Sequence, residues 1–222
     1  MEKKIICMGN SYKNGGRCLA GIEVRHSENG YKVVRTNEGF PNWVRPVMDN
    51  GNNGIPEILV GSFSMLDVLS VEVTDAVPVG AHCENVHFSS IRKIGRIGQN
   101  TNNLTPLCDT YHNLIFGNRG KAVPNEVFIN GGYSLMFIKP ENPQIITQID
   151  ENNREKFRIQ FSHNGVEYNL PLTDAKYIDD LHAKIRQRGL RNTGELYLTL
   201  SLGVNYSDWH YKLVAGVIDL AA

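Results

Sequence analysis

The stretch that decides the fold is Phe157–Leu172, FRIQFSHNGVEYNLPL. Apolar and polar side chains alternate on both sides of Asn164-Gly165, with the two-residue period of half-buried strands. Asn-Gly is the strongest short hairpin signal, because both turn positions tolerate positive φ. The sequence therefore predicts two antiparallel strands joined by a tight turn.

The rest of the C-terminal half extends this hairpin into a longer order of elements. Residues 134–139 predict a strand before it, and Thr173 caps a predicted helix that Gly189 ends. Alternating leucines over 196–202 and an apolar run over 211–220 predict two more strands. A five-stranded Greek-key OB barrel has this order, with its helix between strands three and four. A generic α+β sandwich fits the same pattern.

The N-terminal half begins in the same manner. Strand-like runs over 4–8 and 18–26 precede a second Asn-Gly turn at 29–30. An irregular stretch rich in Pro, Gly and Asn covers 39–61, and a further strand is predicted over 66–73. Hairpins in comparable places indicate two similar units. We therefore predict a mainly β chain with a few helices, folded as two tandem OB-like Greek-key barrels.

The segment between the two units is polar and glycine-rich over 95–103, as is typical of a linker. Thr105-Pro106 then predicts a helix that runs to Phe116, because a capping residue with proline after it favours a helix start. We expect this helix to pack between the halves. The predicted domains are a first barrel over 1–96, a linker and interdomain helix over 97–130, and a second barrel over 131–222.

The charge balance limits the ways in which this chain can bind nucleic acid. The sequence has 23 Lys and Arg against 23 Asp and Glu. Proteins that coat duplex nucleic acid without specificity normally carry a strong basic excess. Any contact with nucleic acid or a nucleotide must therefore come from a local patch.

Hydropathy and cysteine content favour a cytoplasmic protein. No apolar run approaches the roughly 18 residues of a membrane span, and the apolar run near Met1 is too short for a secretory signal. The four cysteines are widely spaced, and disulfides are rare in the cytosol. We expect no membrane partner and no disulfide.

The first candidate site is Asn10–Ala20, NSYKNGGRCLA, where Lys13 and Arg17 flank Gly15-Gly16. Glycine lets a backbone approach a ligand closely, and loop amides beside cations suit a phosphate. The spacing matches neither a Walker A loop nor a dinucleotide fingerprint, so we expect no cofactor. The alternative is a surface hairpin with two solvated charges.

Trp43 and Arg45 lie in the irregular stretch and are expected to approach the same end of the first barrel. An arginine beside an indole can hold a base and its phosphate through stacking and charge. The alternative is that Trp43 fills the core.

In the second unit, the loop between strands four and five is predicted over 203–210. It holds Tyr206 and Trp209, with Tyr211 and Lys212 directly after it. Aromatic rings beside a cation form a stacking platform for bases, worth about 1–3 kcal/mol per base. The alternative is that Trp209 and Tyr211 seal the end of the barrel.

The densest basic cluster is Arg92, Lys93 and Arg96, and Arg119 and Lys121 come later in the chain. If the chain folds back at the linker, these side chains could line one groove between the barrels. The alternative is a solvated face, which is the commoner outcome for such a run.

Several cysteine and histidine residues are candidate metal ligands. His82, Cys83 and His87 are close in sequence, and Cys108 and His112 lie four residues apart on the predicted helix. Thiolate and imidazole groups bind zinc, but this spacing matches no established zinc signature. No local signature marks a cysteine nucleophile either. We therefore predict no metal site and no catalytic residue.

Four segments together resemble the bacterial dual OB-fold domain family: KKIICMGNSYKNGGRCLAGIE at 3–23, WVRP at 43–46, HCEN at 82–85 and YKLVAGVI at 211–218. The resemblance covers nearly the full chain. It implies two OB barrels in tandem, a place in bacterial or phage conflict systems, and recognition of nucleic acid or nucleotides. It implies no catalytic residue that can be transferred to this sequence.

The leading functional hypothesis is a non-enzymatic recognition protein for single-stranded nucleic acid or a nucleotide-like ligand. Cations would pair with phosphate and aromatic rings would stack on bases. One alternative is an enzyme that processes nucleotides or nucleic acid. Another is a protein-interaction module that blocks or assists a defence component, since OB folds serve many unrelated roles.

Overall fold

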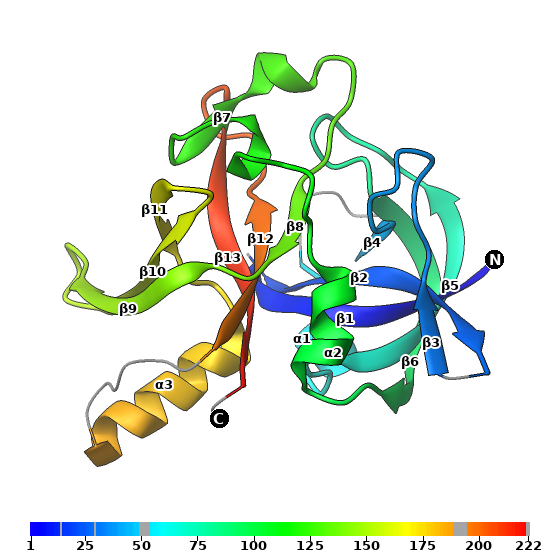
Figure 1. Cartoon of the computed structure of the whole chain (residues 1–222), viewed down its shortest axis with the longest axis horizontal. Helices are drawn as coiled ribbons and strands as arrows, with labels where there is room; N and C mark the ends of the chain where they lie inside the picture. The colour runs from blue at the N-terminus through cyan, green and yellow to red at the C-terminus, as the bar shows by residue number, and fades with distance from the viewer. Residues whose placement is uncertain (14, 29, 49–53, 189–194, 221–222) are drawn as a thin grey trace.

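In the computed structural model, strands β1 to β6 form the first barrel (Figure 1). The structure describes residues 1–222 except 14, 29, 49–53, 189–194 and 221–222, and only the backbone of 184–188. The elements of this barrel are β1 (Glu2–Lys13), β2 (Gly16–Ser27), β3 (Gly30–Val33), β4 (Trp43–Val47), α1 (Glu57–Val60), β5 (Asp67–Ala76) and β6 (Asn85–Arg96). The sheet order is β1-β5-β6-β4-β2-β3, and pairing of β1 with β2 closes a ring of five strands.

The second barrel contains two smaller sheets, ordered β11-β10-β9 and β7-β13-β12-β8. Its elements are β7 (Ala122–Pro124), β8 (Leu135–Ile138), β9 (Glu141–Ile149), β10 (Glu155–His163), β11 (Val166–Pro171), α3 (Ala175–Arg188), β12 (Leu196–Leu202) and β13 (Trp209–Asp219). A parallel bridge between Leu172 and Val214 links the sheets. When β8 and β9 are counted together as strand one, α3 stands between strand three (β11) and strand four (β12), as in an OB fold. The prediction of two tandem OB-like barrels is therefore confirmed.

The hairpin predicted at Asn164-Gly165 is present, with φ of 50° and 74°. Strands β10 and β11 pair antiparallel on either side of it. Asp174, one residue after the predicted Thr173, caps α3: its Oδ1 accepts a hydrogen bond from the Tyr177 N–H at 3.1 Å. The predicted helix end at Gly189 lies outside the described residues, as does Asn29 of the second turn.

The single helix predicted over 105–116 is wrong. The chain forms α2 (Thr101–Leu104) and three short 3₁₀ turns, η1 (Thr105–Leu107), η2 (Ile115–Gly117) and η3 (Asn125–Phe128). The Asp109 carboxylate accepts hydrogen bonds from the N–H groups of Tyr111 and His112, at 3.0 and 3.1 Å. Such local bonds compete with a helix. The Asp109 N–H donates instead to the Phe137 carbonyl at 2.7 Å, so this segment lies along β8.

The barrels pack through a shared apolar cluster that includes Ile6, Met8, Phe137, Tyr197 and Ile218. The rings of Phe137 and Tyr197 stack with centroids 5.8 Å apart. Because both barrels contribute to this cluster, their relative placement is fixed by burial. The domain limits predicted from the sequence are not decided by this packing and stay a prediction. No helix in the described part of the chain is long and apolar enough to cross a membrane.

Candidate functional site

The candidate site is a cavity of about 530 Å³ at the junction of the two barrels. OB barrels bind ligands through the loops between strands one and two and between strands four and five. In the first barrel these are the β1–β2 turn with Lys13 and the β5–β6 loop with His82, and both residues line the cavity. The second barrel contributes Gly203 and Val204 from its β12–β13 loop. Ligand loops of both barrels therefore open onto one space.

The wall between the barrels holds Arg45 in a network of buried polar groups. Its Nη1 lies 2.5 Å from His82 Nδ1, and its Nη2 donates to Ser201 Oγ at 3.2 Å. The same Nη2 pairs with Glu84 Oε1 at 3.2 Å, and Glu84 also accepts a hydrogen bond from the Ser134 hydroxyl. Arg45 is 5% exposed. Ser201 on β12 contacts the guanidinium directly, and Ser134, just before β8, holds its partners Glu84 and His82, so the second barrel helps to fix the guanidinium.

The network also fixes the tautomer of His82. His82 Nδ1 also lies 2.8 Å from Ser134 Oγ. Because a guanidinium has donors only, a protonated Nδ1 would oppose the Arg45 N–H, so Nδ1 is assigned as the acceptor and the ring proton to Nε2. Burial first, and then the Arg45 charge, lower the pKa of His82 to about 3. The Gly203 carbonyl opposes this shift with a smaller effect. The imidazole is therefore neutral at physiological pH.

Three buried polar atoms that belong to the lining residues lack a hydrogen-bond partner within the described part of the chain. They are Arg45 Nε, His82 Nε2 and Asn85 Oδ1. The Gly203 carbonyl lies close enough to the His82 ring to raise its pKa slightly, but it makes no hydrogen bond of normal geometry with Nε2. Leaving a buried donor unsatisfied costs about 1–3 kcal/mol, so such groups require an explanation such as a water or a ligand. Arg45 Nε and His82 Nε2 both carry a proton to donate. The half-buried Lys13 adds a positive charge that also lowers the pKa of His82. This set of donors suits an acceptor-rich anion.

The structure brings Lys13 and Arg45 together at the cavity but places Arg17 elsewhere. The Arg17 side chain is buried, and its Nη2 donates to Glu57 Oε1 at 2.6 Å. Its guanidinium lies over the Tyr12 ring, 4.4 Å from the centroid. Trp43 is half-buried and packs against the cluster between the barrels. It lies on strand β4, which corrects the irregular segment predicted there, because β4 pairs with β2 and β6.

The aromatic residues of the β12–β13 hairpin are exposed. Tyr206, Trp209 and Tyr211 are 70%, 44% and 40% exposed, and Tyr206 and Trp209 share the backbone hydrogen bonds that close the hairpin. Lys212 points the other way and is 1% exposed. Its Nζ donates to the backbone oxygen and Oδ1 of Asn118 at 2.7 and 2.8 Å, and burial lowers its pKa to about 8. That burial leaves no surface of Lys212 for a phosphate.

The basic cluster on β6 is balanced by carboxylates. Lys93 Nζ and Arg96 Nη1 lie 2.7 and 2.8 Å from Oδ1 of the buried Asp67. Burial alone would raise the pKa of Asp67, but hydrogen bonds from Lys93, the Ser64 N–H and Arg96 together lower it. Arg92 pairs with Glu2 at 3.6 Å.

The predicted groove of five basic residues is not formed. Arg119 and Lys121 lie next to β7, at the opposite end of the molecule from β6 in Figure 1. The β6 cluster and these two residues therefore belong to separate surfaces.

The candidate metal ligands do not come together in one cluster within the described residues. Cys83 Sγ accepts from the Gly132 N–H at 3.2 Å, and His112 Nδ1 lies 2.6 Å from Asp109 Oδ2. Within the described residues, no group of three or more His, Cys, Asp or Glu side chains could hold a metal ion.

Sequence reasoning did not place His82 and Asn85 at the candidate site, because it did not recognise β6 and the loop before it as the fifth strand and the loop between strands four and five. The HCEN segment at 82–85 was the available signal. Its His82 and Cys83 were interpreted as candidate metal ligands and not as part of a ligand-binding loop.

Comparison with known proteins adds a family assignment. A deletion mutant of the single-stranded DNA binding protein from Thermus aquaticus matches at 11% identity, covering 98% of this chain and 93% of that one, with a TM-score of 0.20. A similarity that weak carries no argument. No curated protein matches. The family model for the dual OB-containing domain matches residues 3–217. The chain belongs to this dual OB-containing domain family.

Proposed function

We propose that this protein is a non-enzymatic recognition protein that binds a phosphate group of single-stranded nucleic acid or of a nucleotide in the cavity between its barrels. The observation that carries the proposal is a cavity lined by Lys13, Arg45 and His82, whose buried Arg45 Nε and His82 Nε2 make no hydrogen bond of normal geometry within the described residues. A phosphate has several acceptor oxygens and can satisfy both donors. Lys13 supplies the charge that Arg45, already paired with Glu84, does not.

The exposed rings of Tyr206 and Trp209 extend the proposed site. They belong to the same β12–β13 hairpin whose first residues, Gly203 and Val204, line the cavity. Bases stack on exposed aromatic side chains with little sequence preference. A strand with one phosphate in the cavity would place neighbouring bases on these rings. The resemblance noted above supplies the proposed setting, a bacterial or phage conflict system.

Binding to fluorescently labelled oligonucleotides and nucleotides, followed by anisotropy, tests this proposal. The variants are Lys13→Gln, His82→Asn and Trp209→Ala, with Lys32→Gln as a control because Lys32 is exposed on the short strand β3. In His82→Asn, the amide oxygen can still accept from Arg45 while the Nε2 donor is lost. We expect a loss of about 5- to 150-fold in affinity for each site variant, because a hydrogen bond to a charged group or one stacked base is worth about 1–3 kcal/mol.

Circular dichroism and thermal melting confirm that each variant is folded before binding is compared. Wild-type affinity in Lys13→Gln and His82→Asn would refute the phosphate site. A loss of the same size in Lys32→Gln would show that only overall charge matters. Loss in Trp209→Ala alone, with the other variants unchanged, would move the site from the cavity to the hairpin.

A further inference from the structure

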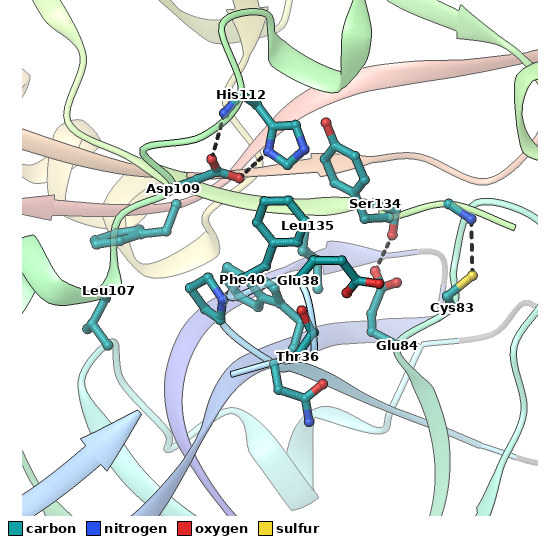
Figure 2. A pocket seen from close by; sticks show the side chains of 16 residues that line it. Thr36, Glu38, Phe40, Cys83, Glu84, Leu107, Asp109, His112, Ser134 and Leu135 are labelled. Carbon is teal, nitrogen blue, oxygen red and sulfur yellow. Dashed lines mark hydrogen bonds and ion pairs between the residues drawn. The ribbon is translucent and has the colours of Figure 1, made fainter. Parts of the chain in front are cut away.

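A second cavity, of about 330 Å³, lies beside the same buried network (Figure 2). Glu84 and Ser134 line this cavity, whereas their network partners Arg45 and His82 line the first one. The segment before β4 forms one wall, and the stretch along β8 that replaces the predicted helix forms another. The contacts of Arg45 and His82 with Glu84 and Ser134 therefore connect the linings of the two cavities.

Aromatic rings form much of the surface of this second cavity. Phe40, Trp43, Tyr133 and Phe137 line it, together with His112. The His112 ring is stacked between two of them, with centroids 4.8 Å from Phe40 and 4.5 Å from Tyr133. This stack holds the rings in place around the space before any ligand enters.

The charged side chains that line this cavity are carboxylates, and the Arg35 guanidinium lies close by, where it donates to the backbone oxygens of Gly39 and Pro106. Glu38, Glu84 and Asp109 line it, and none of its described lining residues is Lys or Arg. Glu84 is paired with Arg45, and Asp109 with His112. Figure 2 shows Glu38 among the side chains around the cavity, and Glu38 itself is exposed. Thr36, another lining residue, has a buried hydroxyl without a hydrogen-bond partner in the described part of the chain.

We propose that this second cavity binds an organic cation, an alkylammonium or a guanidinium group. Aromatic faces with nearby carboxylates attract such a cation through the ring quadrupole and through charge. The same carboxylates repel phosphate, so the two cavities select ligands of opposite charge. This proposal does not depend on the phosphate site, because no residue that supplies an unsatisfied donor there lines the second cavity.

Calorimetric titration with defined cations tests the proposal. Choline and its neutral isostere 3,3-dimethylbutan-1-ol compare charge at constant shape. Spermidine and N-acetyl-arginine methylamide distinguish a free amine from the arginine side chain of a peptide. We expect choline to bind at least about tenfold more tightly than the isostere, as cation–π recognition in a partly desolvated site implies. The tighter of the other two probes identifies the source of the cation.

Variants of Glu38 locate the site, because Glu38 is exposed and its replacement leaves the fold intact. Glu38→Gln should weaken cation binding about two- to fivefold, the worth of one exposed charge, and Glu38→Lys should weaken it about 4- to 25-fold, because the charge is reversed. Glu151→Gln, in the turn between β9 and β10, is the matched control and should bind as wild type.

Equal binding of choline and its isostere, unchanged affinity in Glu38→Lys, or no binding of any cation would overturn the proposal. Labelled oligonucleotide binding is measured on the same variants. It should be unchanged in Glu38→Gln, so failure of the cation site and failure of the phosphate site are read separately.

Discussion

The neutral state of His82 makes a quantitative prediction about stability and pH. The folded pKa of His82 is lowered to about 3, because the ring is buried beside the Arg45 guanidinium. An unfolded histidine titrates near 6.5, so the unfolded chain takes up a proton at a pH where the folded chain does not. This residue therefore contributes stability above pH 6.5 that is lost as the pH falls toward 3. Between pH 7.5 and 5.0 the loss is about 2 kcal/mol, and it changes little if the folded pKa is 4 rather than 3.

Urea unfolding of wild type and His82→Asn at pH 7.5 and 5.0 measures this loss. Other titrating groups contribute equally to both proteins, so the difference between their pH dependences isolates His82. We expect wild type to lose about 2 kcal/mol more than the variant over this interval. Equal pH dependence in the two proteins would refute a neutral buried imidazole. If the variant does not fold, the ¹⁵N chemical shifts of the wild-type ring report its protonation state, and a midpoint near 6.5 would have the same meaning.

Three further predictions concern packing, a second buried acid and salt. Gly216→Ala should lower the free energy of unfolding, measured in urea, by about 1–3 kcal/mol, because the added Cβ would clash with the Met8 carbonyl of the facing barrel. Gly203→Ala is the control and should be neutral, because its Cβ would make ordinary van der Waals contacts. Burial raises the pKa of Asp174 to about 6, above its unfolded value, so the protonated carboxyl stabilises the fold at low pH. The free energy of unfolding of wild type should therefore fall by about 1.4 kcal/mol from this group between pH 5.0 and 7.5, and Asp174→Asn should not show that fall. Oligonucleotide affinity should fall about 5- to 25-fold between 50 and 500 mM salt, as one or two phosphate contacts require, and a much steeper dependence would contradict a local site on a neutral chain.

The barrel architecture was predictable because its strongest signals are local. Alternation around Asn164-Gly165 sets the faces of β10 and β11, and the turn residues take the positive φ that the pattern requires. The order of strands and helix in the C-terminal half then follows from short segments read one at a time. Strand β9 was missed there, because Pro140 interrupts the first strand and divides it into β8 and β9, and the short β7 was missed within the predicted linker.

The first barrel was harder to predict because its last strand, β6, is irregular. Strand β6 pairs with β5 through three register shifts, near Val68, Val73 and Asp75. Each bulge disturbs the two-residue alternation that marks a strand. The parallel pairing of β4 with β6 is a long-range contact that no local pattern encodes. Sequence reasoning therefore found the number of units but not the strands that close the first one.

Charge alone did not indicate which cations could reach a ligand. Lys13 and Lys212 are both lysines beside aromatic residues in sequence, yet the first lines a cavity and the second is buried against Asn118. What separates them is the direction in which each side chain leaves its strand. That direction depends on register and on the neighbouring barrel, neither of which composition reveals.

The position of Arg45 shows why the site needs both barrels. Successive residues of a strand face opposite sides of the sheet, and Val44 packs into the core of the first barrel. Arg45 must therefore point out of that barrel, where an isolated OB unit would leave it in water. Ser134 and Ser201 of the second barrel enclose it instead, together with Glu84. Burial of the guanidinium is thus a property of the pair of barrels. A dual arrangement can in this way build a polar binding cavity that neither barrel could form by itself.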